Sequence, residues 1–334
     1  MDRVMIPPVT APAFLAAAGW PGARILPLAG DASFRRYFRV VDGDRTAVLM
    51  DAPPEHEDSQ PFLAIAGHLD GLGFSAPRIL AVDLDKGLLL LEDFGDTRVN
   101  PLLEREPALE TVIYERAIDV LVALHRQPPP ADLAAYDGPV LHREVDLLVD
   151  WYMPALALDH DRQGFASAWA HVFMPLLKQG GAPVLVLRDY HADNLMWLPE
   201  RPVLQSLGLL DFQDGLAGHP AYDLVSLLQD ARRDISPTLE EAMLDRYVKA
   251  AGIADVQGFR AQYEILGAQR NTKILGIFTR LWKRDGKAGY LAFQPRVWGY
   301  LERNLRHPAL SAVKMWFDAN VPAEARGAAW GKAA

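Results

Sequence analysis

A segment in the middle of the chain carries carboxylate and amide side chains at a spacing that suits phosphoryl transfer. Asp189 is followed five positions later by Asn194. An Asp can accept the proton of an attacking hydroxyl, and an Asn at this spacing can hold magnesium through its side-chain oxygen. A second carboxylate, Asp211, ends the short apolar run 207–210, where a further magnesium ligand would stand. The pattern predicts Asp189 as the base and Asn194 and Asp211 as metal ligands.

The structural alternative is a polar turn between two strands, 184–187 and 195–198. A lone Asp and Asn at this spacing would favour that alternative. The pairing of this loop with a strand that ends in Asp211-Phe212, in the right order and at short distance along the chain, favours a functional site.

An Asp-Phe-Gly tripeptide lies upstream, at 93–95. It has the sequence that binds magnesium in protein kinases, but it precedes Asp189, which is the wrong order. It follows the apolar stretch 87–92, and this arrangement suits a hinge whose backbone groups hydrogen-bond an adenine. The predicted hinge contacts are Leu91, Glu92 and Asp93.

Composition limits the class of protein. The 334 residues are 50% hydrophobic and 23% charged, so the chain can bury the core of one large domain or two modest ones. The net charge of −9 disfavours nucleic-acid and membrane-surface binding, which need basic surface. The absence of cysteine excludes disulfides, and neither a signal-peptide pattern nor a membrane-spanning run is present. We expect a soluble, cytoplasmic monomer.

The apolar pattern changes once along the chain, from strand-like in 24–95 to helical in 108–317. The expected fold class is therefore α+β with two lobes. The first, residues 1–95, would be a small antiparallel sheet with one helix that ends at the hinge. The second, residues 96–320, would be mainly helical and would carry the catalytic loop and the substrate site. Residues 321–334, rich in Ala and Gly, are expected to form a disordered tail.

The expected strands are 25–28, 34–41, 46–50, 77–82 and 88–91, and the expected helices are 60–72, 108–125, 141–152, 165–177, 222–230, 238–252, 256–284 and 295–305. The loop after the first strand contains Gly30, Asp31, Ala32 and Ser33. Small residues there would let backbone N–H groups approach phosphate oxygens, although most Gly-Asp turns are only turns.

The chain resembles the aminoglycoside phosphotransferase and choline kinase superfamily from about residue 24 to residue 305. Within it, the resemblance is strongest to the bacterial anomeric sugar kinases of cell-wall recycling. The segments that carry it are DASFRRYFR at 31–39, MDAPP at 50–54, RDY at 188–190, NLM at 194–196, LDFQD at 210–214, YD and SL within 222–227, and QR through KILGIF to RDGK at 269–287.

The resemblance implies a bilobal protein-kinase-like fold that binds ATP and Mg²⁺ between its lobes. It implies transfer to the C1 hydroxyl of N-acetylmuramate and N-acetylglucosamine. Asp223 would be the buried acid that braces the catalytic loop, or else a helix N-terminal acid. The implied phosphate-binding residues are Gly30, Asp31, Ala32, Ser33, Phe34 and Arg35.

Two positions depart from the superfamily pattern. The strand lysine that touches nucleotide phosphates in protein and antibiotic kinases corresponds here to Met50, a gap that the sugar kinases share. Another cation must then meet the phosphate charge, and Arg35 is favoured over Arg36 and Arg39. The His that commonly precedes the catalytic loop is replaced by Leu187, at a position that is mainly structural in relatives.

N-acetylmuramate carries a lactyl carboxylate, so a site that selects it needs a cation, ideally an Arg that binds both oxygens. Cations recur at helical spacing late in the chain, at Arg270, Lys273, Arg280 and Arg284. They either line the substrate cleft or form a solvated helix face. Trp151 either stacks on a sugar ring or packs in the core. The candidate substrate contacts are Arg143, Glu144, Arg188, Tyr190, Asp214, Arg270 and Lys273.

Three functions remain open: the amino-sugar kinase, a kinase of the same fold acting on an aminoglycoside, choline or homoserine, and a non-catalytic ATP-binding protein. Cationic substrates are held by clustered acids, whereas the late helices here carry cations, which favours an anionic or neutral sugar. The presence of all three predicted catalytic and metal-binding residues favours an enzyme. A zinc site at His191 and Asp193 lacks the helical His spacing and any cysteine.

Overall fold

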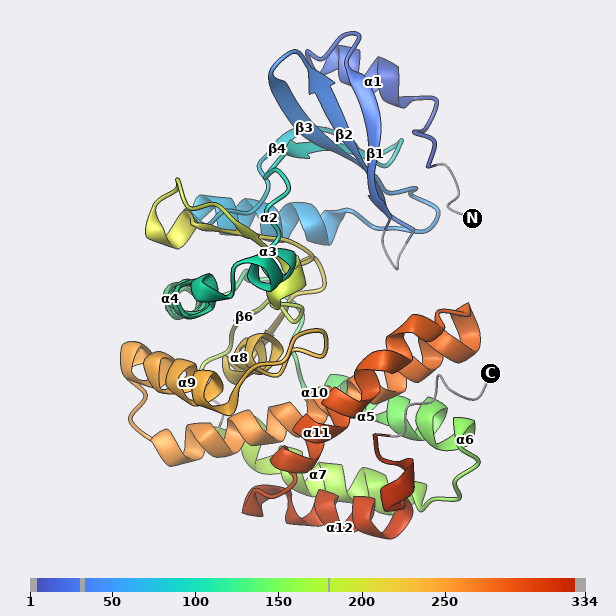
Figure 1. Cartoon of the computed structure of the whole chain (residues 1–334), viewed down its shortest axis with the longest axis vertical. Coiled ribbons are helices and arrows are strands. Elements are labelled where there is room, and N and C mark those ends of the chain that lie inside the picture. The colour runs from blue at the N-terminus through green and yellow to red at the C-terminus, as the bar shows by residue number, and fades with distance from the viewer. Residues whose placement is uncertain (1–4, 31–33, 180, 328–334) are drawn as a thin grey trace. The chain divides into compact units, whose positions relative to one another are not determined.

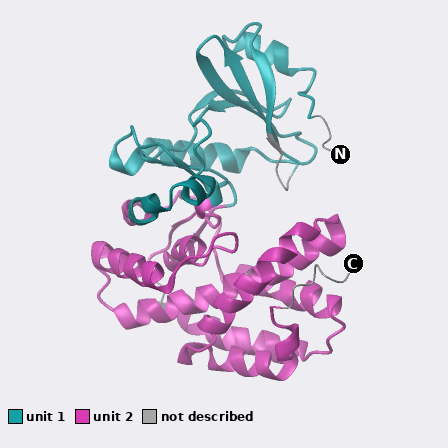
Figure 2. Cartoon of the chain, in the orientation of Figure 1, with its two compact units in different colours: residues 1–116, 193–214 teal, residues 117–192, 215–334 magenta. Residues whose placement is uncertain are grey.

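The structure is a computed structural model that describes residues 5–30, 34–179 and 181–327. Its chain divides into two compact units, shown in different colours in Figure 2. The sheet unit contains residues 1–116 and 193–214, and the helical unit contains residues 117–192 and 215–334. The sheet unit therefore includes a segment from the middle of the chain. The lobe boundary predicted at residue 95 stays a prediction.

The sheet unit is built on a five-stranded antiparallel sheet with the strand order β1-β2-β3-β5-β4 (Figure 1). Its strands are β1 (Arg24–Gly30), β2 (Arg36–Asp42), β3 (Arg45–Asp51), β4 (Ile79–Asp83) and β5 (Leu88–Glu92). All five strands were predicted from the sequence. A two-residue turn joins β2 to β3, and its first residue, Gly43, has φ 60°, a conformation that favours glycine.

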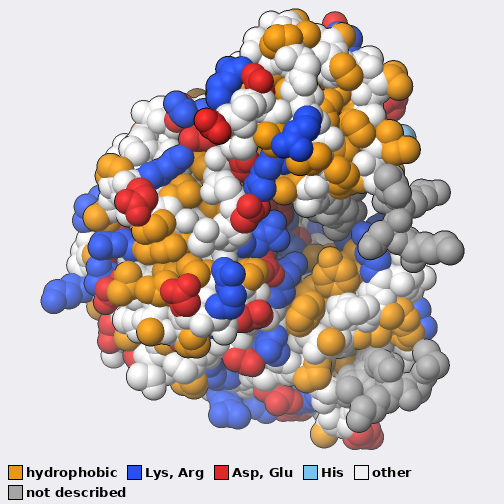
Figure 3. Space-filling model, turned by 45° about the horizontal axis from the view of Figure 1, so that its top comes forward, with side chains coloured by type: hydrophobic (Ala, Val, Ile, Leu, Met, Phe, Trp, Pro, Cys, Tyr) orange, Lys and Arg blue, Asp and Glu red, His pale blue; other side chains and the backbone are white. Residues whose placement is uncertain are grey.

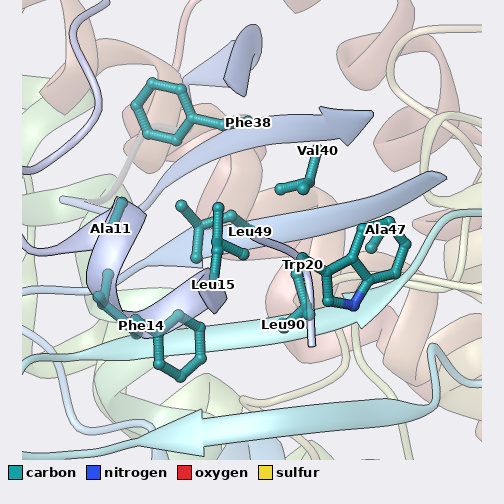
Figure 4. Packing of buried hydrophobic residues seen from close by; sticks show 10 residues of the cluster. Ala11, Phe14, Leu15, Trp20, Phe38, Val40, Ala47, Leu49 and Leu90 are labelled. Atoms are coloured by element: carbon teal, nitrogen blue, oxygen red, sulfur yellow. The ribbon is translucent and has the colours of Figure 1, made fainter. Parts of the chain in front are cut away.

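A short helix, α1 (Ala11–Ala17), covers one face of this sheet (Figure 4). Phe14 and Leu15 from the helix, and Trp20 beyond it, form one buried cluster with strand residues Phe38, Val40, Ala47, Leu49, Leu88 and Leu90. We did not predict α1, because a helix this short depends on tertiary packing more than on its own propensity. By strand alternation, Tyr37 and Val48 point to the opposite face of the sheet.

The remaining elements of the sheet unit are α2 (Gln60–Gly71), α3 (Val99–Arg105) and a hairpin of β7 (Leu195–Trp197) with β8 (Leu207–Leu209). Backbone hydrogen bonds fix the hairpin: Leu209 N–H donates to Ser75 O at 2.8 Å, and Trp197 N–H donates to Thr97 O at 2.8 Å. A Cβ on Gly208 would lie 2.7 Å from the Phe94 ring, so only glycine fits there. These contacts hold the chain that precedes Asp211 against residues 94–97.

The helical unit contains most of the helices. Helix α4 (Glu110–His125) is divided between the two units at residue 116. The helical unit then contains α5 (Gly138–Leu147), α6 (Met153–Ala155), α7 (Arg162–Gln179), α8 (Ala221–Leu228), α9 (Pro237–Ala251), α10 (Val256–Asp285), α11 (Gln294–Asn304) and α12 (Ser311–Asn320), with strands β6 (Val184–Val186) and β9 (Leu216–Gly218). Asp255 caps the N-terminus of α10 by accepting from Gly258 N–H at 2.9 Å, and Gly286 ends it with φ 69°.

Helix α10 packs closely against α5 and α8. A Cβ on Gly276 of α10 would lie 2.3 Å from the backbone carbonyl carbon of Leu147, the last residue of α5. The predicted helix 141–152 is α-helical only as far as Leu147, and the chain then forms a π-helical turn at Leu148–Tyr152. Glycine at this crossing allows the two backbones to meet.

The tail contains more structure than the sequence indicates. Residues Ala323–Ala325 form a 3-10 turn, and the Tyr152 hydroxyl donates to Ala325 O at 2.5 Å. The part of the tail from residue 328 onward lies outside the described residues.

No helix among the described residues is long and apolar enough to cross a membrane. On the face shown in Figure 3, Lys and Arg side chains are interspersed with Asp and Glu side chains.

Candidate active site

The backbone of the predicted catalytic loop is held by one buried carboxylate. Asp223, in the first turn of α8, is fully buried and accepts hydrogen bonds from Leu187 N–H at 2.7 Å and Arg188 N–H at 2.8 Å. Arg188 has φ 68°, a left-handed conformation that costs a non-glycine residue on the order of 1 kcal/mol. The two bonds to Asp223 stabilise that conformation, so Asp223 is an acid in the first turn of α8 that also braces the loop.

Tyr190 and His191 anchor the loop from the other side. Tyr190 is 2% exposed, and its hydroxyl donates to Ala117 O at 2.9 Å. The structure therefore gives Tyr190 an anchoring position in place of the predicted substrate contact. His191 is also buried and lies 3.2 Å from the Arg232 guanidinium.

The Asp189 side chain is 38% exposed, and its Oδ1 lies 3.5 Å from Nη2 of the buried Arg270. Burial would raise the pKa of Asp189, but the positive charges of Arg270 and Lys273 outweigh that effect and lower the pKa to about 2. Asp189 is therefore ionised near neutral pH and can accept a hydrogen bond from a hydroxyl group. Such a weak base takes a proton only late in a reaction, as the hydroxyl becomes acidic.

Glu144 is the centre of a buried hydrogen-bond network beside Asp189. It is 6% exposed, and it accepts from Gln269 Nε2 at 2.8 Å and from Lys273 Nζ at 2.9 Å. The Tyr136 hydroxyl and the Arg188 guanidinium donate to the same carboxylate. Burial would raise the pKa of Glu144, but Lys273 and Arg188 lower it to about 2. The structure thus places Glu144 as the holder of two cations, a position that differs from the predicted direct sugar contact.

Tyr222 joins the two cations of α10. Its hydroxyl lies 3.3 Å from Arg270 Nη1 and 3.3 Å from Lys273 Nζ, and its ring centre lies 5.4 Å from the Arg270 guanidinium. We define the cation cluster as Arg188, Arg270 and Lys273, which surround the carboxylates of Glu144 and Asp189. Sequence reasoning missed Tyr136 and Tyr222 as members of this network, although Tyr222 stands in a segment that carries the family resemblance.

The other residues considered as substrate contacts stay predictions, and most of them are exposed. Arg143 is exposed on α5, next to the buried Glu144. Arg284 is exposed at the end of α10, where it pairs with Asp285 at 2.7 Å. Asp214 is exposed and belongs to the sheet unit. Trp151 is half-buried in the π-helical turn.

A cavity of about 490 Å³ lies within the sheet unit, in the size range of ligand sites. One wall is the face of the sheet opposite α1, and the other wall is formed by α2 and by the hairpin with the chain that follows it. Most of the lining is apolar, with polar groups at Glu92, Asp93, Asp96, Asn194 and Asp211. Apolar lining residues include Leu28, Tyr37, Val48, Phe62, Leu91, Met196, Leu210 and Phe212.

The two predicted metal ligands meet at one end of this cavity. Asn194 Nδ2 lies 3.3 Å from Asp211 Oδ2, and Gln213 Nε2 donates to Asp211 Oδ1 at 2.7 Å. Asp211 has φ 58°, a second left-handed non-glycine residue, and its side chain is 39% exposed. Sequence reasoning did not assign Gln213, which stands in the Leu-Asp-Phe-Gln-Asp segment.

This donor set fits magnesium. Mg²⁺ prefers oxygen ligands and is held by one or two protein groups together with water and substrate phosphates. Asn194 and Asp211 supply an amide oxygen and a carboxylate. Within the described ranges, no group of three or more His, Cys, Asp or Glu side chains could hold a metal ion, and magnesium needs no such group.

The predicted hinge also lines the cavity, through Leu91, Glu92 and Asp93. The Asp93 carboxylate lies 2.7 Å from Arg39 Nε and accepts from Gly95 N–H at 2.9 Å. Glu92 pairs with Arg201 at 2.7 Å. The carboxylate of the upstream Asp-Phe-Gly tripeptide is thus bonded to β2 and to its own segment, and the hinge role of residues 91–93 stays a prediction.

The predicted phosphate loop is described in part. Gly30 ends β1, whereas Asp31, Ala32 and Ser33 lie outside the described residues. The side chain of Phe34 is exposed and stacks on His56 with ring centres 4.5 Å apart. Arg35 is buried, and its Nη2 lies 3.9 Å from Asp211 Oδ1.

Solved structures define the class of fold. The structure matches a putative aminoglycoside phosphotransferase from Ralstonia eutropha with a TM-score of 0.61 and 18% identity, over 92% of this chain and 98% of the other. It matches a choline kinase from Streptococcus pneumoniae with a TM-score of 0.58 and 12% identity, over 86% and 93% of the two chains. The α+β, bilobal, protein-kinase-like fold predicted from the sequence is confirmed.

The chain belongs to the phosphotransferase enzyme family, whose model matches residues 24–260. It is 40% identical to the N-acetylmuramate/N-acetylglucosamine kinase of Caulobacter vibrioides, with 94% of this chain and 96% of that protein aligned. It is also 40% identical to the protein of the same name from Pseudomonas aeruginosa, over 90% of this chain and 91% of that protein. The family resemblance predicted from the sequence is confirmed.

Proposed function

We propose that this protein transfers the γ-phosphoryl group of ATP to the C1 hydroxyl of N-acetylmuramate and N-acetylglucosamine, a reaction of peptidoglycan recycling. The observation that carries the proposal is the 40% identity, across almost the whole chain, to two kinases named for these sugars. The reaction uses ATP, so we place it in the cytoplasm, and we expect the protein to act as a monomer.

The cavity of the sheet unit would bind the nucleotide. Its apolar walls, with Val48 and Leu91 on one side and Met196 on the other, suit a flat base. The hinge at 91–93 would supply backbone hydrogen bonds to the adenine. Asn194 and Asp211 would hold magnesium at the polar end, and a bound magnesium ion would neutralise part of the phosphate charge.

Asp189 would orient the sugar hydroxyl and accept its proton. The anomeric hydroxyl of a free sugar is more acidic than an ordinary alcohol, so a carboxylate with a pKa of about 2 can take the proton late in the transfer. The bond from the C1 oxygen to the γ-phosphorus forms as the bond from that phosphorus to the bridging oxygen of ADP breaks. Most of the rate acceleration would come from positioning.

The cation cluster favours an anionic acceptor. Its three positive charges face the two carboxylates of Glu144 and Asp189, so one positive charge is left over. The lactyl carboxylate of N-acetylmuramate would balance that charge, and Arg270 is the member that lies next to Asp189. Cationic acceptors such as choline or an aminoglycoside would be repelled by the same cluster, which supports the amino-sugar kinase over the second candidate function.

Phosphorus NMR tests the proposal directly. The wild-type protein and its Asp189→Ala variant would be incubated with magnesium ATP and, separately, N-acetylmuramate, N-acetylglucosamine, choline and kanamycin. A sugar 1-phosphate signal that disappears in the variant is the expected result. Transfer to choline or kanamycin alone, or no transfer at all, would overturn the proposed substrate and leave only the fold and family.

A further inference from the structure

The strand position that carries a phosphate-binding lysine in protein kinases holds a buried methionine here. In those enzymes the lysine of the third strand touches the nucleotide phosphates and pairs with a glutamate of the following helix. Met50 of β3 is fully buried and lies opposite Tyr37 in the strand register. A thioether carries no charge, so another cation must meet the phosphates.

Arg35, just before β2, lies within ion-pair distance of Asp211, a residue that lines the cavity. Its side chain is 10% exposed, and its guanidinium lies 3.9 Å from Asp211 Oδ1, the predicted metal ligand. Arg35 stands two positions before Tyr37, a residue of β2 that lines the cavity. A cation beside the metal-binding carboxylate stands close to where the phosphates of a bound nucleotide would lie.

Glu57 binds both Arg35 and the residue before it. Its Oε2 lies 3.7 Å from Arg35 Nε, and its Oε1 accepts a hydrogen bond from Phe34 N–H at 3.0 Å. Glu57 lies between β3 and α2 and is 19% exposed. Because one carboxylate contacts the backbone and the side chain of consecutive residues, it fixes the direction in which the guanidinium points.

We propose that Arg35 and Glu57 replace the lysine–glutamate pair of protein kinases. Arg35 contacts the nucleotide phosphates, and Glu57 is the positioning residue that aims the guanidinium at them. The proposal rests on the proposed function for its nucleotide ligand, and it assigns Glu57 a role that the sequence did not indicate. A guanidinium also offers paired donors for phosphate oxygens, which a lysine does not.

The two neighbouring arginines are used elsewhere. Arg36 points to the opposite side of the sheet, where its Nε donates to Asp51 at 2.7 Å. Arg39 binds Asp93 at 2.7 Å and Asp96 at 2.8 Å. Among the contacts of the described residues, Arg35 is the member of this trio within ion-pair distance of Asp211.

Nucleotide binding without any sugar tests the pair apart from catalysis. Isothermal titration calorimetry would compare ADP, which carries phosphates, with adenosine, which does not, in the presence of magnesium and again in EDTA. We expect Arg35→Ala to weaken ADP binding by about 10- to 100-fold, the effect of losing a charge-assisted contact, and to leave adenosine binding unchanged. Arg36→Ala is the matched control, and its ADP affinity should stay within about threefold of wild type.

A double-mutant cycle tests the role of Glu57. Glu57→Gln should weaken ADP binding by about three- to tenfold in the wild-type background. In the Arg35→Ala background the same change should have little effect, because Glu57 acts through Arg35. Equal effects in both backgrounds would show that Glu57 does not position Arg35.

Unfolding of a variant and failure of the proposed function can both be distinguished from failure of the Arg35–Glu57 pair. Melting temperatures confirm folding, and Arg35→Gln replaces Arg35→Ala if the alanine variant unfolds. An Arg35 variant that binds ADP as tightly as wild type, or that loses ADP and adenosine equally, would overturn the pair. Arg35-dependent ADP binding by a wild-type protein that phosphorylates no sugar would support the pair and overturn the proposed function.

Discussion

Lys273 donates a hydrogen bond of 2.9 Å to Glu144 in the interior of the helical unit. The same carboxylate oxygen also accepts from Arg188, so two cations from distant parts of the chain share one acceptor. Removal of that acceptor would take a main partner from one buried and one partly buried charge, which is costly in a low-dielectric interior. Glu144 therefore determines where the cations beside Asp189 lie.

We expect Glu144→Ala to lower the free energy of unfolding by about 3–5 kcal/mol and to reduce sugar phosphorylation more than tenfold. Urea denaturation and steady-state kinetics measure the two effects. Arg143→Ala, at the exposed neighbouring position, is the control and should change stability by less than about 0.5 kcal/mol. A Glu144→Ala variant as stable and active as Arg143→Ala would contradict this role.

The carboxylate of Glu144 also predicts a pH dependence of stability. Its pKa is lowered from the ordinary 4.5 to about 2, so the folded protein binds the proton less readily than the unfolded chain does. The stabilisation is complete above pH 4.5 and is lost as the pH falls toward 2. Acid unfolding of Glu144→Gln, which cannot titrate at this position, should be less steep than that of wild type over this range.

Asp189→Asn should reduce kcat by about 10²- to 10⁴-fold, because the amide cannot accept the proton of the sugar hydroxyl. ADP affinity should not change, since Asp189 is not among the residues that line the cavity of the sheet unit. Rapid-quench kinetics and calorimetry on the same preparation give both values. An Asn variant with more than a third of the wild-type kcat would exclude Asp189 as the base.

Local patterns were sufficient to predict much of the fold. Apolar patterns predicted the five strands and the long helix α10, whose ends are capped in the structure by Asp255 and Gly286. Helix α1 escaped prediction because its stability comes from packing against the sheet, which no short segment reveals. The π-helical turn after Leu147 was also missed, and it follows the close crossing of α5 with α10 at Gly276.

The sequence was less informative about the site. The sequence pattern predicted Asn194 and Asp211 as metal ligands, and the structure places Asn194 Nδ2 3.3 Å from Asp211 Oδ2. The Glu144 network joins Tyr136, Arg188 and Lys273, which are far apart along the chain, so it became visible only once the helices were placed. Left-handed backbone at Arg188 and Asp211 has no sequence signal, because neither residue is a glycine.

His219 predicts a second pH effect, at a milder pH. Ala221 N–H donates to its Nδ1 at 3.2 Å, and its Nε2 lies 2.8 Å from Gln262 Oε1, so the neutral ring satisfies both neighbours. Protonation of Nδ1 would direct its new N–H at the Ala221 N–H. Burial lowers the pKa of His219 from 6.5 to about 4. Stability from this group is complete above pH 6.5 and is lost as the pH falls toward 4.

The size of the His219 effect follows from the shift in pKa, and it reaches up to about 3 kcal/mol. His219→Asn keeps an acceptor for Ala221 N–H and does not titrate in this range. The difference between wild type and this variant in the free energy of unfolding should therefore change between pH 7 and pH 4. A difference that stays constant across this range would show that His219 is protonated equally in the folded and unfolded states.

Two glycine-to-alanine changes separate the effect of helix propensity on stability from the steric effect of the added Cβ. Alanine favours helix over glycine by about 1 kcal/mol, so Gly299→Ala, at an exposed position in α11 with no atom within 4 Å of the new Cβ, should raise stability by up to that amount. Gly276→Ala would place its Cβ 2.3 Å from the Leu147 backbone, which a side-chain rotation cannot relieve. We expect it to lower the free energy of unfolding by at least about 2 kcal/mol. Because α10 also carries Arg270 and Lys273, Gly276→Ala should raise the KM for the sugar while leaving ADP binding intact. If alanine is tolerated as well at position 276 as at position 299, α5 and α10 can move apart without a cost in stability.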